Sequence, residues 1–374
     1  MIVRGNKNLL ETKLVAVLNS SQSKTPCGND GWIKATSAAV NKLANSGYTI
    51  VTSLGLNTWE MSCYLAAKQG GNQVIISPMF DDSEGADIFR KALYDFDLDE
   101  QKTAMVFVKS GVKNRSDKGA WQVRDRAVFE IAEKIVPIAI RPGGKIEKLL
   151  EEYKTVKAID ESNRIPYAKA GYLPPKYQRT KDNAKIEKWD YIVHWTKTCH
   201  GPWPHESTSE FYKKLLASSD VYPNCAFNTL QNILEKRVIF SSSKHIRDGR
   251  GVIGFSESSP TEIAAAIRWC PKSVNYNFEP YGIGIHKEEA SRLGFRPVIY
   301  GSSVDYKKLA DSDKPFFQNK GEKNVDWTSE KEWRCIVDFD FSPIDQSKII
   351  VCVWSESEAE YLRKKIVYHV ISIH

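Results

Sequence analysis

Small, hydroxyl-bearing and basic residues follow the apolar segments in the N-terminal half of this chain of 374 residues. Backbone amides at helix N-termini bind phosphate groups well when hydroxyls, Lys and Arg surround them. Neither G-x-G-x-x-G nor G-K-[ST] occurs, so the sequence favours neither a standard dinucleotide fingerprint nor a P-loop. Ordinary loop composition is the alternative interpretation. The predicted nucleotide or phosphate ligands are Asn19, Ser20, Ser21, Lys24, Ser53, Gly55, Arg124 and Arg126.

Two carboxylates near these positions could take part in catalysis. Glu60 lies at the predicted start of a helix, in the loop after a predicted strand. A carboxylate there could polarise water against an anomeric carbon, or stabilise the cation that forms as a base departs. The helix dipole also favours an acid in the first turn without any catalysis. Asp125 lies between two arginines, and we expect it chiefly to orient them.

A second candidate group lies near the C-terminus, in the motif W-T-S-E-K-E-W-R. We predict a long strand over residues 327–340. Side chains alternate between the faces of a strand, so Glu330, Glu332 and Arg334 would share one face. Two carboxylates beside an arginine could stabilise a ribosyl oxocarbenium ion, or could form a structural salt-bridge network. His194, in a predicted strand, could hydrogen-bond a ribose or a diphosphate, or could be structural.

The histidines and cysteines do not form a recognisable metal motif. The seven cysteines are scattered without a C-x-x-C pair, which argues against a zinc ribbon or a disulfide framework. His200 and His205 lie close to Cys199 but lack the spacing of a metal site. We therefore expect no metal, no cofactor and a reducing cytoplasm. No run of about 18 apolar residues occurs, so no membrane span is predicted.

The elements that would position these residues form two patterns. Alternating strands and helices in the first pattern predict an α/β fold, a Rossmann-like doubly wound parallel sheet whose ligands bind at the C-terminal ends of its strands. The second pattern predicts a separate α+β domain. We expect a Rossmann-like domain over 1–155, a basic linker over 156–190 and the α+β domain over 191–374. The strands predicted in the first domain are 14–18, 48–52, 73–77, 104–108 and 136–140, and its helices are 31–46, 59–68 and 121–134.

The formal net charge of +7 is unevenly distributed. Residues 1–155 carry 21 basic and 18 acidic residues, yet residues 81–100 within them carry eight acids and two basic residues. The linker carries 8 basic and 5 acidic residues, and its tyrosines alternate with lysines, a combination that suits base stacking and phosphate contact. A tethering arm without a ligand is the alternative. The predicted DNA-binding residues are Lys113, Arg115, Arg141, Lys169, Lys176 and Arg179.

The first 140 residues resemble the DNA-processing protein A and LOG-like Rossmann superfamily. The resemblance lies in N-S-S-x-S-K after the first strand, S-G-Y-T-I-V-T-S-L-G, V-R-D-R-A-V-F-E-I-A and I-A-I-R-P-G-G. Asn19 to Ser21 replaces the G-S-R of DNA-processing proteins, and only half of the LOG motif P-G-G-x-G-T-x-x-E is present. Members of the superfamily bind nucleotides or single-stranded DNA, and some cleave N-glycosidic bonds.

The C-terminal half resembles a bacterial domain family of uncharacterised function that is often found near defence genes. The matching pieces are H-W-T, N-I-L, F-S-E, G-I-G-I, V-I-Y and W-T-S-E-K-E-W-R, in that order. The layout also resembles ADP-ribosyltransferase-like folds, which have an early His or Arg and a late strand Glu.

Both resemblances, together with the charge, lead to one hypothesis and two alternatives. We predict a DNA glycosylase that flips a base, modified or not, into the first domain and hydrolyses its base–sugar bond, in bacterial defence against phage. The first alternative is an NAD-dependent ADP-ribosyltransferase or NAD glycohydrolase that uses Glu330, Glu332 and His194. The second is a sensor that binds a nucleotide or single-stranded DNA without chemistry.

Overall fold

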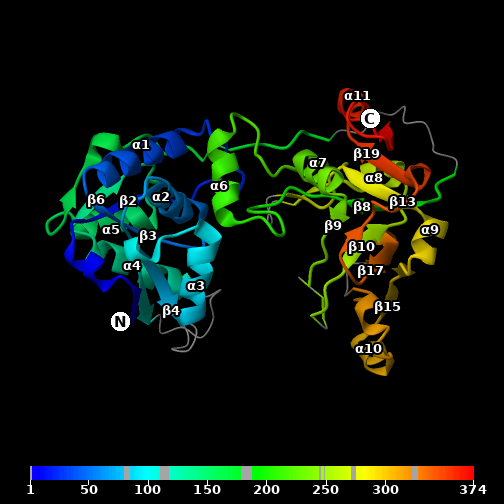
Figure 1. The fold of residues 1–374 in the computed structure, drawn as a ribbon, viewed down its shortest axis with the longest axis horizontal. Coiled ribbons are helices and arrows are strands. Elements are labelled where there is room, and N and C mark those ends of the chain that lie inside the picture. The colour runs from blue at the N-terminus through cyan, green and yellow to red at the C-terminus, as the bar shows by residue number, and fades with distance from the viewer. Residues whose placement is uncertain are drawn as a thin grey trace. The chain divides into compact units, whose positions relative to one another are not determined.

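The computed structural model describes residues 2–79, 85–109, 118–169, 171–177, 188–243, 246–247, 249–270, 275–321 and 327–374. It divides into two compact units, each made of two stretches of chain (Figure 1). Unit 1 comprises Met1–Leu173 and His200–Pro223, and unit 2 comprises Pro174–Cys199 and Asn224–His374. Lys113, Arg115 and Arg179, three of the predicted DNA-binding residues, lie outside the described residues.

Unit 1 is built on a seven-stranded sheet in the order β1-β5-β4-β3-β2-β6-β7, parallel except for β1, which pairs antiparallel with β5. This confirms the predicted Rossmann-like parallel sheet. From β2 the chain adds strands on one side up to β5 and then returns to add β6 on the other side. The switch point therefore lies between β2 and β6. The strands are β1 (Ile2–Gly5), β2 (Leu14–Leu18), β3 (Thr49–Ser53), β4 (Gln73–Met79), β5 (Thr103–Lys109), β6 (Lys134–Pro137) and β7 (Ala158–Ile159).

Helices cover both faces of this sheet, because its apolar strands send alternate side chains to two cores. From β2, Val15 and Val17 enter the core that α1, α2, α3 and α6 cover, while Leu14, Ala16 and Leu18 enter the core under α4 and α5. The helices are α1 (Gly31–Asn45), α2 (Asn57–Lys68), α3 (Gly85–Phe96), α4 (Lys118–Ile131), α5 (Lys145–Tyr153) and α6 (Thr208–Ala217), with 3-10 turns at Lys7–Glu11, Glu100–Lys102 and Glu161–Asn163.

Helix α6 lies in unit 1, although the sequence placed it in a continuous domain over 191–374. Its apolar side chains Phe211, Tyr212 and Leu215 are buried in the core shared with α1, α2 and α3. The backbone also joins α6 to the β2–α1 loop, since the Gly28 amide donates to the Ser218 hydroxyl at 2.9 Å. This packing could not be inferred from chain order, because more than 100 residues separate α6 from the α2 and α3 helices that it contacts.

The predicted linker is also divided between the two units. Ala158–Ile159 forms β7 beside β6, and the Tyr172 amide donates to the Thr25 carbonyl at 2.8 Å, so the segment up to Leu173 belongs to unit 1. Pro174 to Tyr177 belongs to unit 2, where Tyr177 packs in the core with the rings of Tyr276, Tyr281 and Trp354. Apolar and aromatic side chains thus bind this basic segment to the units it joins.

Unit 2 contains a second seven-stranded sheet in the order β14-β17-β10-β8-β13-β19-β20, antiparallel except for the β19–β20 pair. The strands of the unit are β8 (Tyr191–Trp195), β9 (Val238–Ile239), β10 (Ile253–Ser256), β11 (Trp269–Cys270), β12 (Asn275–Tyr276), β13 (Gly282–His286), β14 (Arg296–Pro297), β15 (Ile299–Gly301), β16 (Phe317–Asn319), β17 (Glu332–Cys335), β18 (Phe339–Asp340), β19 (Ile349–Val353) and β20 (His369–Ser372). Its helices are α7 (Ala226–Lys236), α8 (Pro260–Ala266), α9 (Lys287–Arg292), α10 (Ser303–Lys308) and α11 (Glu356–Arg363), with 3-10 turns at Lys314–Phe316, Trp327–Glu330 and Gln346–Lys348.

The long strand predicted over 327–340 is wrong. Trp327–Glu330 forms a 3-10 turn, and β17 begins only at Glu332. Lys331 between them has a φ of +46°, a left-handed backbone conformation that a strand does not contain. Glu330 is therefore not on the strand face that carries Glu332 and Arg334. Among the described residues, no helix is long and apolar enough to cross a membrane.

Candidate functional site

A cavity of about 510 Å³ lies at the switch point of unit 1, and we call it the switch-point cavity. The loops after β2 and β6 and the N-termini of α2 and α5 form its walls. Ligands of doubly wound sheets bind at this position because the loops diverge on either side of it. The lining residues are Asn19, Ser20, Ser21, Leu56, Thr58, Trp59, Arg124, Asp125, Arg141, Pro142, Gly143, Gly144, Lys145, Ile146, Tyr167 and Lys169.

Two helix N-termini meet this cavity without a side-chain cap. Helix α2 begins after Leu56 and helix α5 after Gly144, and neither capping residue offers a side-chain hydrogen bond to the first turn. Helices α8 and α11, by contrast, each begin with a serine capping box. The first-turn amides of α2 and α5, with the positive ends of both helix dipoles, are thus available for an anion.

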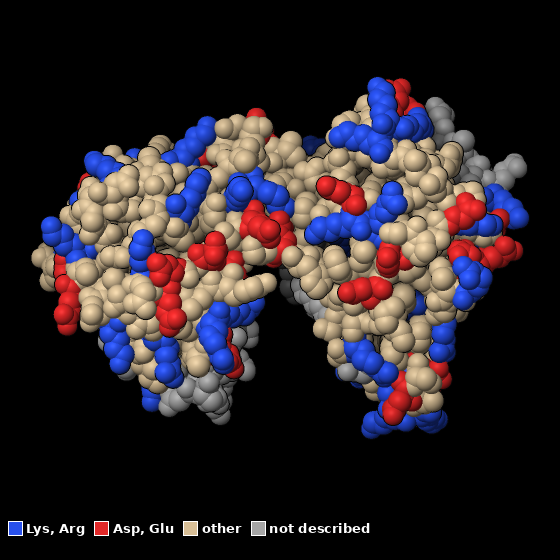
Figure 2. All heavy atoms as spheres, in the orientation of Figure 1, with Lys and Arg blue, Asp and Glu red and all other residues tan. Residues whose placement is uncertain are grey.

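The charges of the lining residues also favour an anion. Arg124, Arg141, Lys145 and Lys169 are cationic, and Asp125 is the single acid among the lining residues. Within the described part of the chain, the side chains of Arg141, Lys145 and Lys169 form no ion pair. Figure 2 shows basic and acidic groups mixed over the visible face of unit 1. The cavity is therefore a local excess of positive charge on a mixed surface.

Arg124 and Asp125 form a buried ion pair in the cavity wall. The Arg124 Nη2 and Nε both donate to Asp125 Oδ1, at 2.6 and 2.9 Å. The guanidinium lies over the rings of Trp59 and Trp121, with Cζ 5.2 and 4.7 Å from the ring centroids. Burial raises the pKa of Asp125 and the charge of Arg124 opposes that shift, while burial lowers the pKa of Arg124. Asp125 thus holds Arg124, whereas Arg126, the other arginine that we expected it to orient, pairs with Glu152 instead.

Asn19 and Ser20 join the two loops of the switch point. The Asn19 Nδ2 donates to the Thr36 hydroxyl of α1 at 2.9 Å, and its Oδ1 accepts from the Ala139 amide. The Ser20 hydroxyl accepts from the Arg141 amide at 2.9 Å. These two predicted ligands therefore shape the cavity, and their side chains are already engaged.

Glu60 lies in a second cavity of unit 1, of about 460 Å³, which we call the Glu60 cavity. Its Oε1 accepts from the Gly55 amide at 2.9 Å, and its Oε2 accepts from the Tyr212 hydroxyl of α6 at 2.8 Å. Burial and the Glu60 charge raise the pKa of Tyr212 well above its usual value, so it stays a neutral donor. The lining residues are Ser21, Gln22, Ser23, Lys24, Pro26, Gly55, Leu56, Asn57, Glu60, His200, Gly201, Pro202, Thr208, Phe211, Tyr212 and Tyr222.

The structure separates several predicted ligands from both cavities. Ser53 is buried, and its hydroxyl donates to the Ile76 carbonyl at 2.7 Å, linking β3 to β4. Arg126 forms an exposed ion pair with Glu152 of α5 and lines neither cavity, so its role as a phosphate ligand stays a prediction. Lys176 is exposed in unit 2, whereas Lys169 lines the switch-point cavity.

Two of the candidate residues of unit 2, Glu332 and Arg334, belong to a structural network. All the nitrogens of the Arg334 guanidinium are bonded: to both oxygens of Glu332 on the same strand face, to Gln318 and to the carbonyls of Pro315 and Phe317. The side chain of Arg334 is 3% exposed. This is the salt-bridge alternative that the sequence left open, and it places no unused charge at this position.

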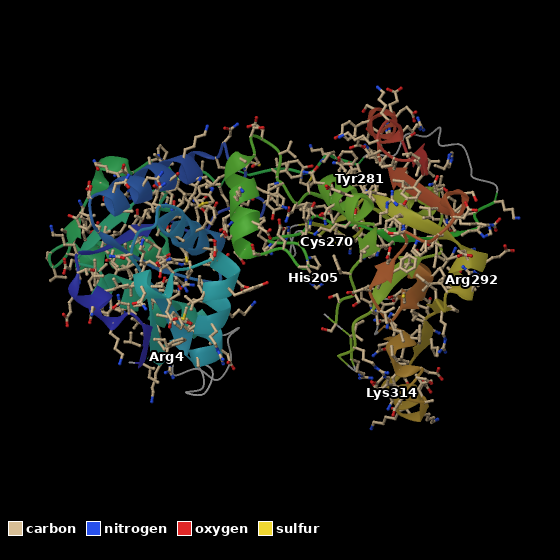
Figure 3. The ribbon with its side chains drawn as sticks, in the orientation of Figure 1. Arg4, His205, Cys270, Tyr281, Arg292 and Lys314 are labelled. Atoms are coloured by element: carbon tan, nitrogen blue, oxygen red, sulfur yellow. The ribbon has the colours of Figure 1, made fainter. Side chains whose placement is uncertain are left out.

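Glu330 and His194 do not join this network. Burial and the Glu332 charge raise the pKa of Glu330. The His194 Nδ1 lies 2.9 Å from the Gly254 carbonyl of β10, and burial lowers the pKa of His194. Neither residue lines a described cavity. Tyr281, another residue of unit 2 (Figure 3), stabilises the unit, because its hydroxyl donates to Glu358 at 2.9 Å.

The sequence did not predict roles for Lys145, Tyr212 and Gln22. Lys145 directly follows the P-G-G turn, so its place in the sequence could have identified it as a residue of this loop. Tyr212 carries no local signal, since it reaches Glu60 only through tertiary packing. Among the described residues, no group of three His, Cys, Asp or Glu side chains could hold a metal ion. His205, one of the two histidines near Cys199, lies in the loop before α6 (Figure 3).

No protein-family model and no curated protein matches this chain. Solved structures resemble it over part of its length. DNA processing protein A from Helicobacter pylori, described for its single-stranded DNA binding, has 16% identity and a TM-score of 0.31 over 42% of this chain and 69% of its own. DNA processing protein A from Streptococcus pneumoniae has 14% identity and a TM-score of 0.28 over 43% and 62%. The molybdenum cofactor carrier protein from Chlamydomonas reinhardtii has 13% identity and a TM-score of 0.27 over 42% and 90%.

These likenesses lie in the N-terminal part of the chain and concern the fold alone. The resemblance of the C-terminal half to a bacterial domain family stays a prediction.

Proposed function

We propose that unit 1 binds a nucleotide of DNA through its phosphate in the switch-point cavity and hydrolyses the N-glycosidic bond of that nucleotide. The observation that carries the proposal is the convergence of two uncapped helix N-termini with Arg141, Lys145 and Lys169 on one cavity. Together these groups provide backbone donors and exposed cations for a phosphate. Tyr167, which is partly exposed and also lines the cavity, provides a ring surface that suits a nucleic acid.

Glu60 is the carboxylate that we assign to the chemistry. Its two oxygens accept from Gly55 and Tyr212, so the carboxylate is held in one orientation at the wall of its cavity. In the proposed reaction, the oxygen of a water molecule bonds to the anomeric carbon as the bond from that carbon to the base nitrogen breaks. The water loses a proton, and the departing base takes one up. Glu60 would polarise the water and stabilise the positive charge on the sugar.

Binding is tested with a fluorescent single-stranded oligonucleotide at several salt concentrations. The Lys145→Ala variant should bind more weakly and lower the slope of log affinity against log salt by about 0.7, because one phosphate contact is lost. Lys148→Ala is the matched control, since Lys148 is an exposed lysine one turn further along α5 and does not line the cavity. Equal effects of both variants would contradict a phosphate site at this cavity.

Catalysis is tested by incubating the protein with genomic and phage DNA and measuring released bases by mass spectrometry. We expect base release and alkali-labile sites from the natural sequence and none from Glu60→Gln. A parallel incubation with NAD tests the alternative substrate through the release of nicotinamide. Full base release by Glu60→Gln would remove Glu60 from the mechanism. Binding with no product from DNA or NAD would make the protein a sensor.

A further inference from the structure

We infer that the Glu60 cavity binds a nucleobase and that Gln22 reads the hydrogen-bonding edge of that base. The inference rests on the proposed function, in which the switch-point cavity holds the phosphate of the same nucleotide. It adds the location of the base and the class of base that fits there.

Gln22 is the first observation that points to a ligand. The residue is 3% exposed and lines the Glu60 cavity, and neither its Nε2 nor its Oε1 has a hydrogen-bond partner in the structure. A buried amide without partners costs about 1–3 kcal/mol for each unsatisfied group. Most buried side-chain polar atoms therefore have a partner. Both atoms are almost fully covered in the structure, so a ligand that presents a donor beside an acceptor would satisfy them once the Gln22 side chain turns toward the cavity.

The other walls of the cavity suit a flat, largely apolar ring. Phe211, Tyr212 and Tyr222 are buried aromatic residues of the segment that returns from the second half of the chain. Asn57 does not compete with Gln22 for such a ligand, because its Nδ2 already donates to the Ser23 carbonyl at 2.7 Å. The cavity volume of about 460 Å³ leaves room for a base together with water.

The two cavities adjoin, since Ser21 and Leu56 line both of them. A nucleotide with its phosphate in the switch-point cavity and its base in the Glu60 cavity would have its sugar near these two residues. The bond between sugar and base would then lie on the side of Glu60. Segment His200–Pro223, although distant in sequence, completes this cavity and supplies the hydroxyl that orients Glu60.

Adenine is the base that we expect. A glutamine amide pairs with the adjacent N6 donor and N7 acceptor of adenine through two hydrogen bonds. Such a pair discriminates between bases by about 1–3 kcal/mol, which corresponds to a change of about 5-fold to 150-fold in affinity.

The test uses nucleosides, which lack a phosphate and so report on the Glu60 cavity alone. Binding of adenosine and thymidine is measured by calorimetry for the natural sequence and for Gln22→Leu. We expect adenosine to bind more tightly than thymidine, and Gln22→Leu to weaken adenosine binding by about 10-fold or more. Gln73→Leu is the matched control, because Gln73 is also buried with an unpartnered Oε1 but lies in β4 and lines no described cavity.

A second readout separates loss of the amide from loss of the fold. Replacing an unpartnered buried amide with an apolar side chain should leave the thermal unfolding midpoint of Gln22→Leu unchanged or raise it. Lys145→Ala should leave adenosine binding unchanged while it weakens oligonucleotide binding. Unaltered adenosine binding by Gln22→Leu, or equal binding of adenosine and thymidine, would overturn the inference while the phosphate site stands. Adenosine binding without any salt-dependent oligonucleotide binding would instead overturn the proposed function alone.

Discussion

The substitution Arg334→Lys tests whether unit 2 takes part in the chemistry. The Arg334 guanidinium makes five hydrogen bonds, and an ammonium group has only three donors, so at least two bonds are lost. At roughly 1.5 kcal/mol for each bond of a charged group, the expected loss of stability in unit 2 is about 3 kcal/mol. Base release should fall only as far as the folded fraction falls, since all five partners are structural.

The assay is hydrogen exchange of the β10 and β17 amides, read by mass spectrometry, beside base release by the same preparation. Exchange in β10 and β17 should become faster by about 100-fold, the factor that corresponds to a loss of stability of about 3 kcal/mol. Arg292→Lys is the control, because Arg292 is an exposed residue of α9 (Figure 3) whose ion pair with Glu289 is screened by solvent and contributes little to stability. Native exchange with abolished base release would refute the reasoning and place the active site in unit 2.

Three further predictions concern single side chains. Tyr212→Phe removes the hydroxyl that orients Glu60, so we expect slower base release and a free energy of unfolding, measured with denaturant, that is lower by about 1–2 kcal/mol. Unchanged release would show that Glu60 does not need this donor. Burial lowers the pKa of His194 below its unfolded value near 6.5, so the stability of the protein should fall as the pH falls below that value. The thermal unfolding midpoint of His194→Gln should depend less on pH in this range. Gly55→Ala should lower the free energy of unfolding by about 1–2 kcal/mol, because Gly55 has a φ of +89° and an added Cβ would lie 3.1 Å from Trp121. An unchanged free energy of unfolding would refute this.

Local sequence signals predicted the elements of unit 1 well. The apolar runs around Val15, Val51 and Val106 became buried strands, because a parallel strand covered on both faces must be apolar at nearly every position. The same alternation of strands and helices predicted the edge at which the switch-point cavity lies. Asn19, Ser20, Ser21, Arg124 and other residues of the switch point were therefore named correctly as neighbours, since each follows a strand or lies near one in the chain.

Individual roles within that edge were harder to predict. Asn19 and Arg124 have the chemistry of ligands, yet their polar atoms are engaged by Thr36 and Asp125. Arg126, two residues beyond Arg124 along α4, points to the opposite side of the helix and pairs with Glu152. A helix turns by about 100° at each residue, so adjacency in sequence does not place two side chains in the same cavity.

By itself, the sequence determined that this chain contains a Rossmann-like sheet with basic and small residues at the edge formed by the C-terminal ends of its strands. Those properties follow from strand periodicity and from chain order, which are local. Only the tertiary structure decided that α6 returns to unit 1, where Tyr212 contacts Glu60 and the aromatic residues beside it close the cavity around Gln22. That arrangement depends on the burial of an apolar helix face against residues nearly 150 positions away, and no local pattern encodes which surface such a face will cover.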